Sequence, residues 1–164
     1  MNLNFYKYHG CGNDFVLVDN RSKIFNKGNI ALLSKLCNRH FGIGADGVIL
    51  IENDSEQDFK MIYFNADGSQ TFCGNGARCA VSFAQHLKII KNKTNFMAVD
   101  GAHFAEIKNG VVSLKMGDVT NIEIQENAIF LNTGTQHHVE LVTDLAKYDV
   151  FKEGKKIRDT YEDP

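Results

Sequence analysis

Two cysteines stand six positions apart in the stretch TFCGNGARCA, residues 71–80, on either side of a Gly-Asn-Gly sequence. Such a pair is a candidate disulfide, a candidate metal clip, or a reactive thiol with a buried neighbour. Apolar side chains recur at helical spacing over residues 74–90, so Cys73 is expected just before a helix and Cys79 inside it. Unpaired N–H groups and the helix dipole stabilise a thiolate at a helix start. This placement predicts a reactive thiol at Cys73, and a small apolar core residue is the alternative.

The disulfide and the metal clip fit the spacing poorly. A bond from Cys73 to Cys79 would span more than one helical turn, beyond the usual Cα separation. Cys79 falls on the apolar side of the predicted helix, where a free cysteine packs as a small hydrophobic residue. No Cys-x2-Cys pair is present, and His137 and His138 are neighbours on a predicted strand and so point to opposite faces. We therefore expect neither a disulfide nor a metal site.

Polar turn residues accompany the cysteine. Gly74 and Gly76 permit a close approach of the backbone to an anionic group such as a carboxylate. Asn13, Asn65 and Asn75 each offer a donor and an acceptor, which suits the ammonium and carboxylate groups of an amino acid. Asn and Gly are also ordinary turn residues, and this is the competing interpretation of each position taken alone.

The elements that must position these residues form a mixed pattern. The chain predicts an α+β fold in which strands and hairpins surround one apolar helix, residues 74–90, together with a shorter helix over 29–40 that stops near Gly42. Asp-Gly and Asn-Gly pairs between apolar runs predict a meander over 94–117. After Asp144 the chain is charged and weakly patterned, and no further element is predicted there. The remaining predicted strands are 4–10, 15–20, a buried run at 47–52, a strand from 59 into the turn at 65–68, 127–134 and 137–142.

Composition narrows the class of protein. The formal net charge is −2 over 164 residues, which gives no electrostatic reason to expect nucleic acid or an anionic membrane. No stretch approaches the roughly 18 apolar residues of a membrane span, and the first residues lack the pattern of a secretory signal. We therefore expect a cytoplasmic protein whose four cysteines are free thiols. The glycines of GIGADG, residues 42–47, do not open a helix after a strand, so dinucleotide binding is not expected.

Four stretches together resemble a known family. HGCGNDFVLVDN, CNRHFGIGADGVIL, FNADGSQTFCGNGARC and, more loosely, NTGTQHHVELV stand in the order and at about the spacing found in diaminopimelate epimerases. The resemblance implies interconversion of LL- and meso-diaminopimelate, in the biosynthesis of lysine and of peptidoglycan precursors. It implies no pyridoxal phosphate and no metal. Two cysteines would face the substrate's α-carbon from opposite sides, one removing a proton and the other returning one. The implied fold has two lobes, each a barrel-like sheet around a central helix.

The resemblance also assigns roles to single residues. Cys73 matches the first catalytic cysteine, and His137 matches a histidine near the catalytic centre. Asn13, Asn65 and the Gly74-Asn75 turn match substrate-binding positions. The chain departs from the family at Gly134-Thr135-Gln136-His137, where members often have Gly-Asn-Pro-His.

The largest departure is the second catalytic cysteine, since no cysteine follows Cys79. We expect residues 1–116 to form the N-terminal lobe and residues 117–164 an incomplete start of the second lobe. A chain with one thiol could not perform a two-base inversion, so the chain alone is expected to be an inactive fragment of the epimerase. The alternatives are a non-catalytic amino-acid-binding or interaction module, with self-association as a possible homodimer, and a proline racemase-like enzyme of related fold.

Overall fold

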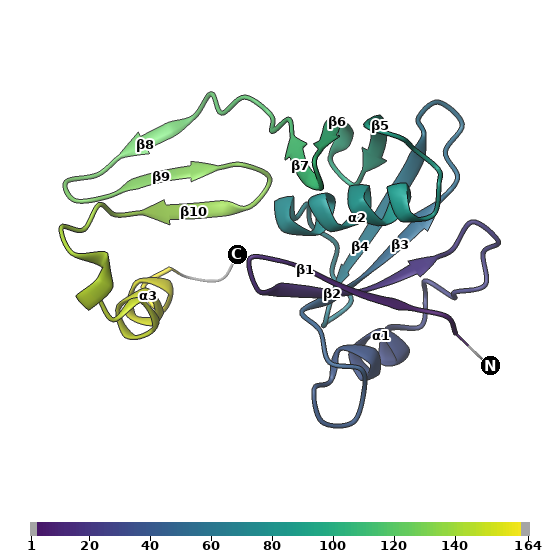
Figure 1. Ribbon diagram of the computed structural model, residues 1–164. Helices are drawn as coiled ribbons and strands as arrows, with labels where there is room; N and C mark the ends of the chain where they lie inside the picture. The colour runs from purple at the N-terminus through teal and green to yellow at the C-terminus, as the bar shows by residue number, and fades with distance from the viewer. Residues whose placement is uncertain (1–2, 162–164) are drawn as a thin grey trace.

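The structure is a computed structural model that describes residues 3–161; the outermost residues of the two predicted lobes, 1–2 and 162–164, lie outside the described residues. Two sheets and three α-helices make up the fold (Figure 1). The strands are β1 (Tyr6–Gly10), β2 (Asn13–Asp19), β3 (Gly47–Glu52), β4 (Phe59–Asn65), β5 (Lys93–Ala98), β6 (Gly101–Lys108), β7 (Val111–Leu114), β8 (Ile122–Ile124), β9 (Ile129–Asn132) and β10 (Gln136–Val139). The helices are α1 (Ile30–Cys37), α2 (Gly74–His86) and α3 (Val150–Arg158), with a short 3-10 turn, η1, at Leu145–Lys147.

The larger sheet contains β1 to β7 in sequence order. It is mixed, because β2 pairs with β3 and β4 pairs with β5 in parallel, whereas the other neighbours are antiparallel. The sheet curls around α2, which contacts β1, β2, β3, β4 and β7 (Figure 1). The prediction of an α+β fold with a barrel-like mixed sheet around a central apolar helix is confirmed.

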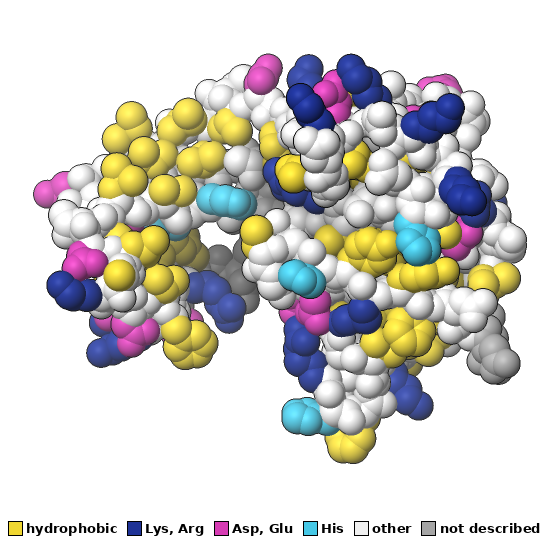
Figure 2. All heavy atoms as spheres, viewed as in Figure 1, with side chains coloured by type: hydrophobic (Ala, Val, Ile, Leu, Met, Phe, Trp, Pro, Cys, Tyr) yellow, Lys and Arg dark blue, Asp and Glu magenta, His cyan; other side chains and the backbone are white. Residues whose placement is uncertain are grey.

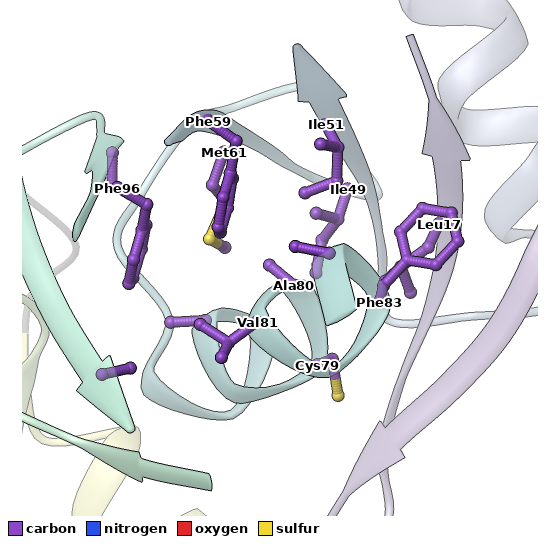
Figure 3. Close-up of a cluster of buried hydrophobic side chains, with 14 of the residues drawn as sticks. Leu17, Ile49, Ile51, Phe59, Met61, Cys79, Ala80, Val81, Phe83 and Phe96 are labelled. Atoms are coloured by element: carbon purple, nitrogen blue, oxygen red, sulfur yellow. The ribbon is translucent and has the colours of Figure 1, made fainter. Parts of the chain in front are cut away.

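Side chains on the two faces of the curled sheet enter two separate cores. Strand β3, GVILIE, is buried along its whole length, as its unbroken apolar run predicts. Because side chains alternate along a strand, Ile49 and Ile51 point toward α2, while Val48 and Leu50 point toward α1. Figure 3 shows the first of these cores, with Ala80 of α2 facing the strands.

The predicted helix ends need correction. Helix α1 ends at Cys37, and Asn38 is its C-cap residue. The side-chain oxygen of Asn38 accepts from the N–H groups of His40 and Phe41. Gly42 is therefore not the helix stop: a Cβ there would lie 1.8 Å from the carbonyl oxygen of Lys35, so this position requires glycine for a close backbone approach.

Helix α2 likewise ends at His86 rather than at residue 90, with Leu87 as its cap. Ile90 is nevertheless buried, at 8% exposure, because the turn after the helix folds back onto the core. The apolar spacing continues past the last helical residue, so the predicted helix was four residues longer than α2.

The segment after residue 117 contributes the second, smaller sheet. Strands β8, β9 and β10 make an antiparallel three-stranded sheet with the order β10-β9-β8. Strand β8 and helix α3 were not predicted. Neither contains a buried residue: β8 is only three residues long, and the few apolar residues of α3 stand among charged ones, so neither gave a signal long enough to indicate an element. Helix α3 begins at the cap Asp149, whose side chain accepts from the N–H of Lys152.

Large apolar side chains of this segment are exposed to solvent. Ile124 is 81% exposed, Leu141 93% and Phe151 85%. Figure 2 shows hydrophobic side chains gathered over the region of β8 and β9. Within residues 3–161, no helix has the length and apolar character needed to cross a membrane.

Candidate active site

A cavity of about 490 Å³ lies where the end of β4, the start of α2 and the β9–β10 turn meet. Five of the six residues predicted for the site line it. The lining residues are Tyr63, Asn65, Thr71, Phe72, Cys73, Gly74, Asn75, Arg78, Met116, Thr133, Thr135 and His137. The fold thus brings the predicted residues of three distant segments to one place.

Cys73 is the N-cap residue of α2, as its sequence position predicts. Its sulfur accepts from the backbone N–H of Gly76 at 3.4 Å. The 13-residue helix directs its positive end at the same sulfur. Both features stabilise negative charge on Sγ. Gly76 also lies close to the core, where a Cβ would come within 3.3 Å of Ile49 Cδ1 and would require a small shift of that side chain.

Asn13, at the start of β2, reaches the same sulfur from another part of the chain. Its Oδ1 lies 3.5 Å from Cys73 Sγ and 3.4 Å from Asn75 Nδ2. Its Nδ2 donates to Asp46 Oδ2 at 2.6 Å. Asn13 is the one predicted site residue that does not line the cavity, yet it contacts two residues that do. The structure therefore joins all six predicted residues in one site.

Asn65 combines the turn role with a position in the cavity wall. Its backbone closes the turn after β4, with its N–H donating to the Ser69 carbonyl at 2.8 Å. Its side-chain Oδ1 accepts from the hydroxyl of Tyr63 at 2.7 Å, and its Nδ2 donates to Ser69 Oγ at 3.0 Å and lies 3.3 Å from Thr71 Oγ1. These bonds fix the side chain at the cavity wall.

Tyr63 is a site residue that the sequence did not indicate. Only 7% of it is exposed, and burial raises its pKa well above the ordinary value, with the charge of a Cys73 thiolate raising it further. The hydroxyl therefore stays protonated and remains a donor to Asn65. Its only sequence signal was a place in an apolar strand, two residues before Asn65.

Arg78 is a second residue of the cavity wall that was missed. It lies one helical turn after Gly74, and its Nη1 donates to the Gly74 carbonyl at 2.9 Å. This contact places a permanent positive charge beside the start of α2 and Cys73. The spacing of four residues from Gly74 could have indicated it, since residues at this spacing share one face of a helix.

The two histidines of β10 point to opposite faces, as predicted. His137 lines the cavity. His138 instead contacts the hydroxyl of Tyr161 and the carboxylate of Glu140, the latter at 2.8 Å. Thr135, in the divergent turn before them, donates its hydroxyl to the carbonyl oxygen of Phe72 at 3.2 Å.

The cysteines are free thiols in different surroundings. Cys79 is 4% exposed and packs in the core behind Cys73, as predicted. Burial raises the pKa of Cys79 to about 11, and negative charge on Cys73 acts in the same direction. Cys37 is also buried, and Cys11 is exposed in the β1–β2 turn. The described part of the chain contains no group of three or more His, Cys, Asp or Glu side chains arranged to hold a metal ion.

A second cavity, of about 430 Å³, adjoins the first behind Phe72. His103 lines it and stacks on the Phe72 ring with a centroid distance of 4.2 Å. None of the six predicted residues borders this cavity. The candidate site is therefore the one that contains Cys73.

Sequence comparisons connect the chain with a known family. The family model described as diaminopimelate epimerase matches residues 5–122. A diaminopimelate epimerase from Flavobacterium psychrophilum is 56% identical over 158 residues, covering 95% of this chain and 62% of that protein. One from Aquifex aeolicus is 36% identical over 176 residues, covering 95% of this chain and 63% of its own length. The chain thus spans somewhat less than two thirds of these relatives.

Solved structures support the fold. A phenazine biosynthesis protein from Bacillus anthracis matches with a TM-score of 0.70 at 13% identity, covering 89% of this chain and 58% of its own. A probable proline racemase from Agrobacterium radiobacter K84 matches with a TM-score of 0.62 at 12% identity, covering 97% and 61%. At these identities the likeness extends to the fold alone. Taken with the family model and the relatives above, it leads to one conclusion: the chain belongs to the diaminopimelate epimerase family.

Proposed function

We propose that this chain supplies one side of a diaminopimelate epimerase active site, with Cys73 as the acid and base on one face of the substrate's α-carbon. The position of the Cys73 sulfur carries the proposal. It caps the 13-residue helix α2 and borders a cavity of about 490 Å³. An α-proton is removed most readily by a group whose charged form is stabilised but not buried. Sγ meets this description, since it receives the Gly76 N–H and faces the cavity.

The cavity wall offers groups of the kinds that an amino acid requires. Gly74 and Asn75 present the first turn of α2, where an anionic carboxylate is favoured. Arg78 adds a positive charge on the same side. We assign Asn65, in the cavity wall, and Asn13, which contacts Cys73 and Asn75, to holding the substrate's polar groups. The proposed ligand is therefore a small amino acid, in this family diaminopimelate.

The proton balance of the proposed step is simple. The Cys73 thiolate takes the α-proton, the S–H bond forms as the C–H bond breaks, and the electron pair stays on the α-carbon next to the carboxylate. In reverse, the Cys73 thiol returns the proton to the same face. His137 lines the same cavity from β10. It is proposed as a catalytic group that exchanges protons near the substrate's α-carbon.

Inversion needs a second proton donor on the opposite face of the carbon. Among residues 3–161, Cys73 is the one cysteine that lines the cavity. We infer that the second thiol is supplied from outside these 164 residues. The chain alone is then expected to exchange the α-proton with retention of configuration and not to invert the centre.

Hydrogen exchange in D2O tests the proposal. The purified 164-residue chain is incubated with LL-diaminopimelate, and deuterium at the α-carbon and the formation of meso product are measured separately. Deuterium incorporation without meso product is the expected result. Binding of diaminopimelate without any exchange would favour the alternative of a non-catalytic amino-acid-binding module. Inversion by the chain alone would contradict the inference of a missing second thiol.

We also propose that residues 1–116 form one lobe and residues 117–164 begin a second. The three-stranded sheet β8–β10 shares no strand pairing with the larger sheet. Its apolar side chains lack a core, as the 81% exposure of Ile124 illustrates. This favours burial of the segment against another polypeptide surface. That surface is either the remainder of a second lobe or a second copy of the chain in a homodimer.

The cellular setting follows from the same proposal. An epimerase that serves lysine and peptidoglycan-precursor biosynthesis acts on a cytoplasmic metabolite, so we propose a cytoplasmic location. The small molecule is the expected partner. The net charge of −2 supports no interaction with nucleic acid or a membrane surface.

A further inference from the structure

The side-chain amide of Asn13 lies between a carboxylate and the candidate catalytic sulfur. On one side, Nδ2 is 2.6 Å from Asp46 Oδ2. On the other side, Oδ1 is 3.5 Å from Cys73 Sγ and 3.4 Å from Asn75 Nδ2. Asp46 does not border the cavity. These hydrogen bonds connect it with Cys73 only through Asn13.

The carboxylate determines which way the amide faces. An ionised carboxylate only accepts hydrogen bonds, so the Asn13 atom that lies 2.6 Å from it must be the NH2 group. The carbonyl oxygen then faces the sulfur. Rotating the amide by 180° would place its oxygen against the Asp46 carboxylate, with repulsion in place of a short, charge-assisted bond.

Asp46 is itself held in place by several contacts. Its Oδ2 also accepts from the backbone N–H of Asp14 at 3.1 Å, and its Oδ1 accepts from Arg39 Nη2 at 2.8 Å. Its backbone N–H donates to the Asp14 carbonyl at 2.9 Å. Arg39 also bonds the Asp14 carboxylate at 2.8 Å. These bonds fix the carboxylate at the point where β2 and β3 begin to pair.

A carbonyl oxygen that faces sulfur distinguishes the two protonation states of Cys73. A thiol donates its S–H to the oxygen, whereas a thiolate has nothing to donate and meets a partial negative charge. The Gly76 N–H and the helix dipole act in the opposite direction. The other titratable or charged groups around the sulfur are Tyr63 from β4, Arg78 and Cys79 from α2 and His137 from β10.

We propose that Asp46 is a positioning residue: it orients the Asn13 amide so that the amide oxygen accepts the Cys73 S–H, and it thereby favours the thiol before substrate binds. The inference rests on the proposed function in taking Cys73 as the acid and base. It explains how one sulfur both gains and loses a proton. The helix start favours the thiolate, the oriented amide favours the thiol, and the opposing effects keep both forms accessible.

Alkylation of Cys73 in the absence of substrate tests the proposal. The rate of modification by iodoacetamide is measured against pH, with the peptide that carries Cys73 followed by mass spectrometry. In Asp46→Asn the new side chain accepts as well as donates, so Asn13 can turn and offer its NH2 to the thiolate. The midpoint of the pH dependence should fall by about one pH unit.

Two controls separate orientation from charge. Asp14→Asn removes a carboxylate of the same network but leaves the bond from Asn13 to Asp46, and it should move the midpoint by less than about 0.3 unit. In an Asn13→Ala background, Asp46→Asn should have no further effect. The proposal would be overturned if Asp46→Asn moved the midpoint equally with and without Asn13, or if Asp46→Asn and Asp14→Asn moved it equally. Either result would mean that Asp46 acts through its charge.

A measurement on the unaltered chain covers the case in which Asp46→Asn does not fold. The side-chain NH2 protons of Asn13 should exchange slowly with solvent, because the Asp46 carboxylate accepts one of them at 2.6 Å. Asn13 NH2 protons that exchange as fast as those of a fully exposed asparagine would overturn the proposal. Because these assays use no substrate, failure of α-proton exchange would refute the proposed function and leave this inference standing.

Discussion

The hydroxyl of Thr135 donates to the carbonyl oxygen of Phe72 at 3.2 Å, and it joins the β9–β10 turn to the residue directly before Cys73. Gly134 supports the same contact, since a Cβ there would lie 3.2 Å from Phe72 Cδ1. The turn that departs from the family pattern thus binds to the backbone of the segment that carries Cys73. His137 enters the cavity from the strand that follows this turn.

Replacing Thr135 by Val should weaken this connection. Valine keeps the shape but lacks the hydroxyl, so the free energy of unfolding should fall by about 1 kcal/mol. Thr135→Ser retains the donor and serves as the control. Chemical denaturation of the three proteins measures the difference, and equal stability of the Val and Ser variants would show that the bond contributes nothing.

Cys79 should make the chain less stable in alkali. Its pKa is raised by burial from 9.0 to about 11, so the folded state keeps a proton that the unfolded chain loses. The stability linked to this proton is complete below pH 9 and is lost as pH rises toward 11. The loss should reach about 2 kcal/mol. Cys79→Ala should remove this part of the pH dependence, at the expense of about 1 kcal/mol at neutral pH through the cavity it leaves. The free energy of unfolding is measured against pH for the original chain and for Cys79→Ala. Identical slopes between pH 9 and 11 would contradict this prediction.

Gly47 should tolerate no side chain. A Cβ at this position would lie 2.4 Å from both the Phe64 carbonyl oxygen and Tyr63 Cε2. Gly47→Ala should therefore displace the Tyr63 ring from Asn65 and reduce the free energy of unfolding by about 3 kcal/mol. Gly117→Ala is the matched control, because nothing lies within 4 Å of its Cβ position. Thermal unfolding compares them, and equal melting temperatures would show that the strand adjusts.

The exposed apolar side chains after residue 117 should promote self-association. Leu141 is 93% exposed and Phe151 85%. The double variant Leu141→Asp, Phe151→Asp should reduce the apparent mass seen by light scattering at high concentration and the binding of a hydrophobic dye. Phe41→Asp, at a site before residue 117 that is 84% exposed, is the control and should change neither. A monomer that binds no dye before mutation would refute the proposal of an unpartnered segment.

Local signals in the sequence predicted the parts of the fold that depend on nearby residues. The helix after Cys73 and the buried strand at 47–52 were found because their apolar residues follow a clear period or form an unbroken run. Helix α3 was missed because it buries no side chain. Its cap Asp149 and ion pairs such as the one between Lys156 and Glu153 involve polar side chains, which a search for apolar periodicity does not reveal.

The site could be predicted in its members but not in its connections. Cys73, Asn65 and Asn75 lie close in sequence, Asn13 was indicated as a polar turn residue, and the family resemblance supplied His137. The bond between Asn13 and Asp46 depends on the parallel register of β2 and β3, which pairs Phe15 with Gly47. Tyr63 reaches Asn65 only because β4 places both side chains on one face. The first relationship has no local pattern, whereas the spacing of two residues along a strand could have indicated the second.

The central claim is that the Cys73 sulfur moves the α-proton. The most direct test compares Cys73→Ala with Cys79→Ala in the exchange of the α-hydrogen of LL-diaminopimelate with D2O. The two cysteines lie on the same helix segment, one at the cavity and one in the core. Cys73→Ala should lower the exchange rate by at least about 100-fold, while Cys79→Ala should retain it within a few-fold. Exchange that survives in Cys73→Ala, or that is lost equally in both variants, would contradict the claim.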